Sequence, residues 1–115
     1  MLQPGPAKKV TIHLNEDTSS GHDFLFREIF SFLLEHGVAG ASLIRPSAGF
    51  GSHHRLHDHD SAGAEGRHLP VRIEFIESKE MLDSILPELC RLTSDGLIEV
   101  QDTTIVKTIA IQEPV

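Results

Sequence analysis

The sequence predicts an α+β fold of the ferredoxin-like βαββαβ type, in which a four-stranded antiparallel sheet carries two helices on one face. Residues 9–14 and 71–75 alternate apolar and polar side chains, as strands with one buried face do. Residues 22–36 and the segment from Ser78 to Leu92 carry apolar side chains at helical spacing. With one further strand after each helix, right-handed crossovers of both halves produce this sandwich.

The first half of the chain is predicted to hold one strand and one helix. Met1–Ala7 contains two prolines and a glycine and is predicted to be a flexible arm. The first strand is therefore expected to begin at Lys8. The first helix is predicted over His22–His36, with Ser20 as its N-cap and Gly37 as the left-handed residue that ends it.

The middle of the chain is predicted to form a hairpin of two strands around a long loop. The second strand is expected within Gly40–Ser47, and the loop follows over Ala48–His68, which has no apolar periodicity. Val71–Phe75 is the clearest strand, and Pro70 before it suits the first position of a strand.

The last part of the chain is predicted to hold the second helix and the fourth strand. Ser78 is expected to cap the helix, and Pro87 inside it is expected to cause a kink or a restart, because it removes a backbone hydrogen bond. The fourth strand is expected between Leu97 and Ile109 with an interruption at Gln101–Thr103, and 111–115 is predicted to be a flexible tail.

Length and charge limit the function classes. The 115 residues predict a single domain over 8–110, including the insertion 48–68. A formal net charge of −7 without a basic patch argues against nucleic-acid binding. No apolar run reaches the roughly 18 residues of a membrane span, and we expect a cytoplasmic protein without membrane insertion. The single Cys90 is expected to be buried and inert.

The predicted loop holds five of the eight histidines of the chain. His53, His54, His57 and His59 are candidate ligands of Zn, Cu or Ni, since imidazole suits these ions. Their spacing matches no fixed zinc motif. A solvated loop is an alternative interpretation, and so is a pH response, because an unperturbed histidine titrates at about 6.5.

Gly49-Phe50-Gly51 at the start of the loop is a candidate anion-binding turn, to which Arg45 would add charge. The alternative is a turn at the base of the hairpin, with Phe50 anchoring the loop on the core. No catalytic constellation emerges from the sequence, and we expect no enzymatic activity. The exposed face of the sheet is expected to carry polar side chains, namely Thr11, His13, Arg72, Glu74, Glu99 and Gln101.

Four motifs carry a resemblance to a known family. They are V-T-I-H-L in the first strand, R-P-S-A-G-F-G-S-H before the loop, L-P-V-R-I-E-F-I-E after it and D-G-L-I-E-V near the end. From Lys8 to about Lys107 the chain resembles the bacterial and archaeal family called domain of unknown function 190. This family is similar to the nitrogen-regulatory PII signalling proteins and to the CutA-type divalent-ion tolerance proteins, which are ferredoxin-like trimers.

The resemblance implies a PII-like homotrimer that senses a small molecule, such as a nucleotide, in the clefts between its subunits. The loop 48–68 would take the place of the PII T-loop and signal to a partner such as a membrane channel or transporter. A CutA-like protein would instead bind divalent metal through the loop histidines. The ligand-binding residues implied are Arg45, Gly49, Phe50, Gly51, His53, Gly96 and Leu97.

The sequence departs from the PII pattern near the last strand. PII proteins bring lysines and arginines there, whereas this chain offers Asp95, Glu99 and Asp102. A triphosphate would meet carboxylates, so a less charged ligand such as a mononucleotide is favoured over ATP. Lys107 is interpreted as a solvated charge, and the alternative is a position near the loop base of a neighbouring subunit.

Overall fold

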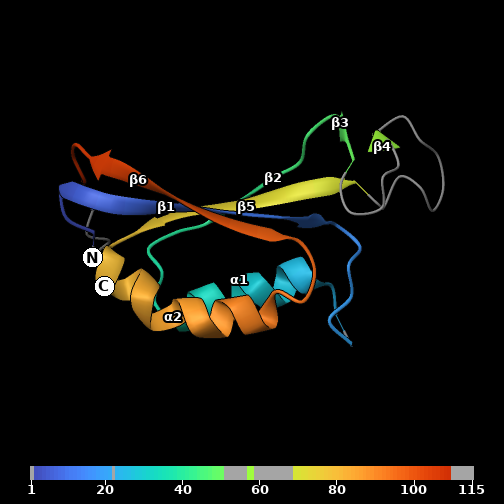
Figure 1. Cartoon of the computed structure of the whole chain (residues 1–115). Coiled ribbons are helices and arrows are strands. Elements are labelled where there is room, and N and C mark those ends of the chain that lie inside the picture. Colours follow the sequence, from blue (N-terminus) through green and yellow to red (C-terminus); the bar gives the residue numbers. More distant parts are fainter. Residues whose placement is uncertain (1, 22, 51–56, 59–68, 110–115) are drawn as a thin grey trace, which may run out of the picture.

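The computed structural model describes residues 2–21, 23–50, 57–58 and 69–109. Its elements are β1 (Gly5–Asn15), α1 (Leu25–Glu35), β2 (Ser42–Ile44), β3 (Ala48–Gly49), β4 (His57–Asp58), β5 (Pro70–Glu77), α2 (Lys79–Leu92) and β6 (Leu97–Ile105). Four strands form an antiparallel sheet in the order β2-β5-β1-β6, and both helices cover one face of it (Figure 1). The predicted ferredoxin-like α+β fold is confirmed.

The core lies between the sheet and the helices, and alternation along the strands builds it. In β5 every second side chain is buried, so that Val71, Ile73 and Phe75 face the helices. The helices contribute apolar residues spaced mostly three or four positions apart, which pack against these strand side chains. The buried core residues of the two helices are Leu25, Ile29, Phe32 and Leu33 of α1 and Leu82, Ile85 and Leu89 of α2.

The first strand begins at Gly5, three residues before the predicted start at Lys8. Gly5–Ala7 pairs with β6, whereas pairing with β5 begins only at Lys8. On their other side these residues have no partner strand in the described part of the sheet. A proline such as Pro6 is tolerated there, because its missing N–H interrupts no pairing on a strand edge. The predicted flexible arm is therefore shorter than expected.

The same pairing corrects the prediction for the last strand. β6 is continuous, and Gln101, Asp102 and Thr103 lie opposite Lys9, Lys8 and Ala7 of β1. The predicted interruption is wrong because the early start of β1 gives these polar residues partners. β6 ends at Ile105, opposite Gly5, and does not reach Ile109 as predicted.

Helix α1 starts later than predicted and ends as predicted. Its N-cap is Phe24, without a side-chain cap. Ser20 does not cap it, because the Ser20 N–H and hydroxyl both donate to the carbonyl of Asp23. At the other end Gly37 has a φ of 77°, the left-handed conformation expected of it.

Helix α2 follows the prediction at its start and differs from it further along. The Ser78 hydroxyl accepts a hydrogen bond from the Met81 N–H at 3.1 Å, which confirms the predicted cap. The helix continues through Pro87 to Leu92 as one element, so that no restart occurs. Cys90 is exposed, so the prediction of a buried thiol is wrong. Cys90 follows the buried Leu89 by one residue, and neighbouring residues of a helix point to different sides, so its thiol points away from the core.

Replacing Ser78 with alanine is expected to lower the free energy of unfolding by about 1 kcal/mol, because the Met81 N–H loses its acceptor. Urea denaturation measures the change. Ser84→Ala is the matched control, since this residue lies exposed inside the same helix and alanine is a better helix former. Equal destabilisation by both substitutions would contradict the capping role.

Candidate ligand-binding cavity

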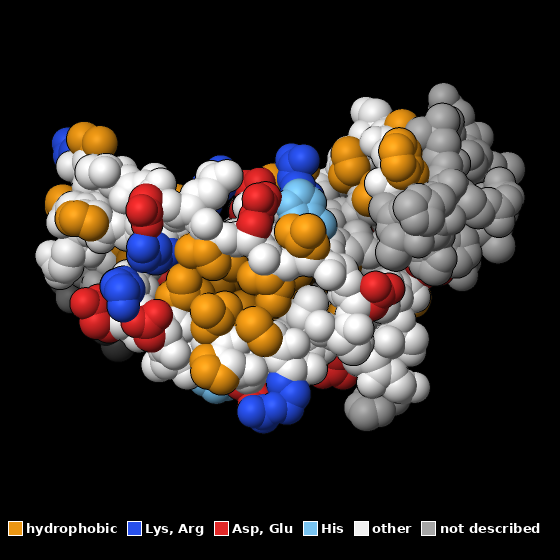
Figure 2. Space-filling view, in the orientation of Figure 1, with side chains coloured by type: hydrophobic (Ala, Val, Ile, Leu, Met, Phe, Trp, Pro, Cys, Tyr) orange, Lys and Arg blue, Asp and Glu red, His pale blue; other side chains and the backbone are white. Residues whose placement is uncertain are grey.

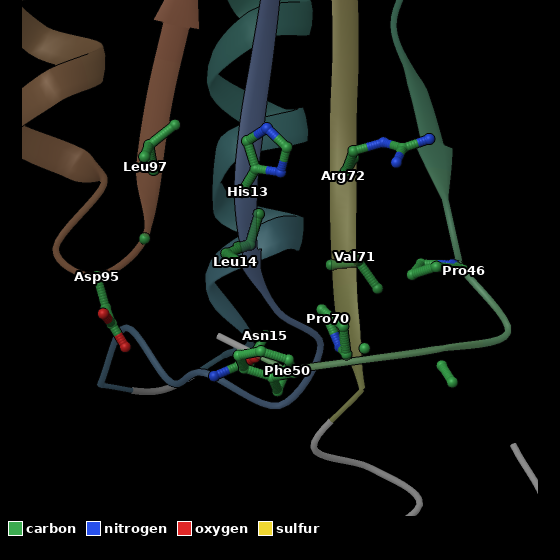
Figure 3. A pocket seen from close by; sticks show the side chains of 13 residues that line it. His13, Leu14, Asn15, Pro46, Phe50, Pro70, Val71, Arg72, Asp95 and Leu97 are labelled. Atoms are coloured by element: carbon green, nitrogen blue, oxygen red, sulfur yellow. The ribbon is translucent and has the colours of Figure 1, made fainter. Parts of the chain in front are cut away.

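A cavity of about 470 Å³ lies where β1, β5 and β6 meet the start of the insertion 48–68. Its volume falls within the range of roughly 300 to 1,000 Å³ that small-molecule sites occupy. The sheet supplies one wall, and residues between Pro46 and Phe50 and the turn at Asp95 and Gly96 supply the others (Figure 3).

Strand register places three side chains in a row on the exposed face of the sheet at this cavity. His13 of β1 lies opposite Leu97 of β6 on one side and opposite Arg72 of β5 on the other. All three line the cavity, as Figure 3 shows. Successive side chains of a strand point to opposite faces of the sheet. Since Leu14 and Val71 are buried against the helices, their neighbours His13 and Arg72 project away from the helices. Leu97 lies opposite His13 and therefore shares its face.

The turn before β6 closes tightly against β1, and glycine makes this approach feasible. Gly96 has a φ of 116°, and a Cβ built on it would lie 2.2 Å from the carbonyl oxygen of His13. A side chain at this position would collide with the backbone of β1. The absence of a Cβ therefore allows Asp95 and Leu97 to flank the cavity.

The insertion enters the cavity through Gly49 and Phe50. β3 pairs with β4, and a Cβ on Gly49 would come within 2.9 Å of Pro70 Cγ, so Gly49 lies close against the start of β5. The Phe50 side chain is 67% exposed. It does not anchor the loop on the core, which was the alternative interpretation, and it lines the cavity instead.

Charges of both signs surround the cavity. His13 Nε2 lies 2.9 Å from Glu99 Oε1, and Arg72 Nε lies 3.6 Å from Glu74 Oε1. The Arg72 Nε atom is buried and has no hydrogen-bond partner among the described residues. Buried polar atoms normally have a hydrogen-bond partner, and the Glu74 carboxylate at 3.6 Å is too far away to supply one.

The structure brings four of the seven predicted ligand-binding residues to this one cavity, namely Gly49, Phe50, Gly96 and Leu97. Arg45 does not line it, because its guanidinium pairs with the Glu16 carboxylate at 2.7 Å. Gly51 and His53 lie outside the described residues. Binding by these residues stays a prediction.

Sequence reasoning missed His13 and Arg72 as cavity residues. It placed both on the exposed face of the sheet and left them without a ligand role. Only the pairing of β1 with β5, which puts His13 opposite Arg72, brings them together, and this register is not among the predictions from the sequence.

The predicted metal ligands His53, His54 and His59 also lie outside the described residues, and His57 is described only as part of the backbone of β4. Within the described ranges no three His, Cys, Asp or Glu side chains form a group that could hold a metal ion. No helix in the described part of the chain has the length and apolarity that a membrane span requires.

Solved structures of PII-like proteins share this fold. CPII, a nitrogen regulatory PII-like protein from Thiomonas intermedia K12 bound to ADP, AMP and bicarbonate, matches with a TM-score of 0.61 and 20% identity over 90% of this chain and 97% of that chain. A putative PII-like signaling protein from Thermus thermophilus matches with a TM-score of 0.63 and 18% identity over 91% of this chain and 94% of that chain. At these identities the likeness concerns the fold.

A family model covers most of the chain. The model of the family DUF190, described as an uncharacterized ACR, matches residues 7–105, which include every strand and helix of the sandwich apart from the first two residues of β1. The predicted resemblance is confirmed, and the chain belongs to the family of domain of unknown function 190.

Proposed function

We propose that the protein is a PII-like regulator that senses a small molecule of the nucleotide type in the cavity beside Gly96 and signals through the insertion 48–68. The observation that carries the proposal is the place of the cavity. It is lined both by the fixed sheet and by the first residues of the insertion. The ADP and AMP bound to CPII, which shares the fold, support a nucleotide ligand.

The lining favours a ligand with a flat apolar ring and little charge. The exposed ring of Phe50 offers a stacking surface, and stacking of a base on an aromatic side chain contributes about 1 to 3 kcal/mol. The Arg72 guanidinium at the cavity offers N–H donors and a positive charge to a phosphate oxygen. Asp95 on the opposite side would repel a triphosphate more strongly than a monophosphate. AMP is therefore the favoured test ligand.

Signalling would follow because one ligand contacts both the sheet and the first residues of the insertion. A ligand that touches Phe50 and the sheet together binds best when the start of the insertion lies against the cavity. It would shift the population of insertion conformations by its difference in affinity between them. The partner would be a protein that recognises one of these conformations, and a membrane channel or transporter is the class we propose.

We further propose that the working form is a homotrimer, with each cavity in a cleft between subunits. The exposed side chains of Phe50 and Leu97 at the rim support this arrangement, because a neighbouring subunit would cover apolar surface there. No covalent chemistry is required, and the proposed role is not enzymatic.

Isothermal titration calorimetry with AMP tests the proposal. The parent protein is expected to bind AMP saturably, and Arg72→Ala is expected to weaken binding at least about tenfold, because a charge-assisted hydrogen bond is lost. Arg91→Ala is the matched control, since this arginine pairs with Glu88 on α2, on the far side of the sheet. It is expected to leave AMP affinity unchanged.

Three results would contradict the proposal. They are no saturable binding of AMP, ADP or ATP by the parent protein, an equal effect of both arginine substitutions, or a response to Zn, Cu or Ni alone. A metal response that disappears when His53, His54, His57 and His59 are replaced by alanine would instead support the CutA-like alternative.

A further inference from the structure

The outer edge of β6 is open. Among the described strands this nine-residue strand pairs only with β1. Proteins usually protect such an edge with lysine, proline or a bulge. Residues 97–105 contain no lysine, arginine or proline.

The two acidic side chains of β6 both have partners on β1, on the side away from the open edge. Glu99 pairs with His13, and Asp102 pairs with Lys8. The hydrogen bond from Lys8 lowers the pKa of Asp102. These charges therefore point inward to β1 partners, and the edge offers unpaired backbone groups to another strand.

Apolar side chains lie exposed on both sides of this edge. Val100 lies opposite the buried Val10, which places it on the helix side of the sheet, and it is 42% exposed. Leu97 lies opposite His13 on the other side and is 55% exposed. Figure 2 shows apolar side chains gathered on the surface between β6 and α2.

The chain itself carries a segment that fits this edge. Residues 106–109, V-K-T-I, follow β6 and are rich in strand-forming residues, yet they pair with no strand in the described part of the chain. Val106 is 87% exposed and Ile109 is 75% exposed. The described part of the chain thus leaves both aliphatic side chains exposed, and a strand of a partner could cover them.

One antiparallel register matches the two stretches at three positions. With Val106 opposite Val100, Ile109 falls opposite Leu97, and Lys107 falls opposite Glu99. Since opposite residues share a face, the valine pair lies on the helix side and the other two pairs lie on the exposed side of the sheet. A shift by one residue would lose all three matches.

The segment cannot reach this edge within its own chain. Gln101–Ile105, which would have to form the connecting turn, are extended and paired with β1. We therefore propose that residues 106–109 of one copy add as an antiparallel strand to Leu97–Val100 of a second copy. This inference rests on the self-assembly named in the proposed function. Because the two surfaces differ, the contact repeats from copy to copy and can close a ring, such as a trimer.

Sedimentation equilibrium on the full chain tests the contact. The parent protein is expected to be oligomeric, and the double variant Val106→Asp/Ile109→Asp is expected to raise the dissociation constant at least about 30-fold, because both apolar pairs are lost. Leu34→Asp is the matched control, since Leu34 is equally apolar and 80% exposed but lies on α1. It is expected to change the constant less than about twofold.

A charge exchange tests the register. Lys107→Glu places two carboxylates opposite each other and is expected to weaken assembly roughly threefold to tenfold. Adding Glu99→Lys in the same chain is expected to restore it. Lys107→Glu with Glu35→Lys is the matched control, because it restores the same net charge at an exposed position of α1. Equal rescue by Glu35→Lys and Glu99→Lys would show that Lys107 acts only through the net charge of the chain.

The outcomes separate this contact from the proposed function. A monomeric parent, or a double variant with the parental dissociation constant, would overturn the contact. In the second case the trimer itself would stand. AMP calorimetry on the parent protein reports on the cavity independently of the mass measurement.

Discussion

Replacing Gly96 with alanine is expected to lower the free energy of unfolding by roughly 2 to 6 kcal/mol. Two costs add. A non-glycine residue at a φ of 116° costs about 1 to 3 kcal/mol. The new Cβ, 2.2 Å from the His13 carbonyl oxygen, would also force β1 and the turn apart, at about 1 to 3 kcal/mol. Chemical denaturation followed by circular dichroism measures the loss.

Gly21→Ala is the matched control for this prediction. Gly21 has a φ of 112°, nearly that of Gly96, but no atom lies within 4 Å of the position of its Cβ. It therefore carries the conformational cost without the collision. Equal destabilisation by the two substitutions would mean that the close approach of the turn to β1 is not what requires glycine.

Replacing Glu77 with alanine is expected to lower the free energy of unfolding by about 2 to 3 kcal/mol. Glu77 is 5% exposed, and its carboxylate accepts hydrogen bonds from the Ala39 N–H at 2.8 Å and the Ser78 N–H at 3.2 Å. It thereby joins the segment after α1 to the junction of β5 and α2. Alanine would leave these backbone donors without their carboxylate acceptor. Urea denaturation measures the loss.

Two further substitutions identify the cause. Glu77→Gln keeps one oxygen acceptor and is expected to lose about half as much. Glu88→Ala removes an exposed carboxylate that pairs with Arg91 and is expected to change stability by less than about 0.5 kcal/mol. If Glu77→Ala were as mild as Glu88→Ala, the buried hydrogen bonds would not be significant for stability.

The fold could be predicted because its strongest local patterns agree with its packing. The alternation over Val71–Phe75 reports directly which side chains face the helices, and the Ser78 cap and Gly37 depend only on their immediate neighbours. The errors arose where pairing with a strand distant in the sequence determines the local structure. Pro6 indicates a loop by itself, and Asp102 indicates an interruption, but each lies in a strand because β1 and β6 pair over Gly5–His13.

The cavity was predictable only in part for the same reason. Gly49 and Phe50 stand out in the sequence because they open a segment without periodicity, whereas His13 and Arg72 look like ordinary polar positions of a strand. Only the register across three strands places them beside Leu97. Arg45 was predicted to bind a ligand because of its charge, but its guanidinium pairs with the Glu16 carboxylate instead.

The contact between Gly49 and Pro70 has a consequence for how this protein can change during evolution. The chain leaves the sandwich and returns to it at one point, since a Cβ on Gly49 would lie 2.9 Å from Pro70 Cγ. Doubling the length of a flexible connection between fixed ends costs only about 0.6 kcal/mol. Because the scaffold itself holds the two ends together, a change of length in this stretch outside the paired residues 57 and 58 would cost little loop-closure free energy. Selection could therefore vary its length while the scaffold stays constant.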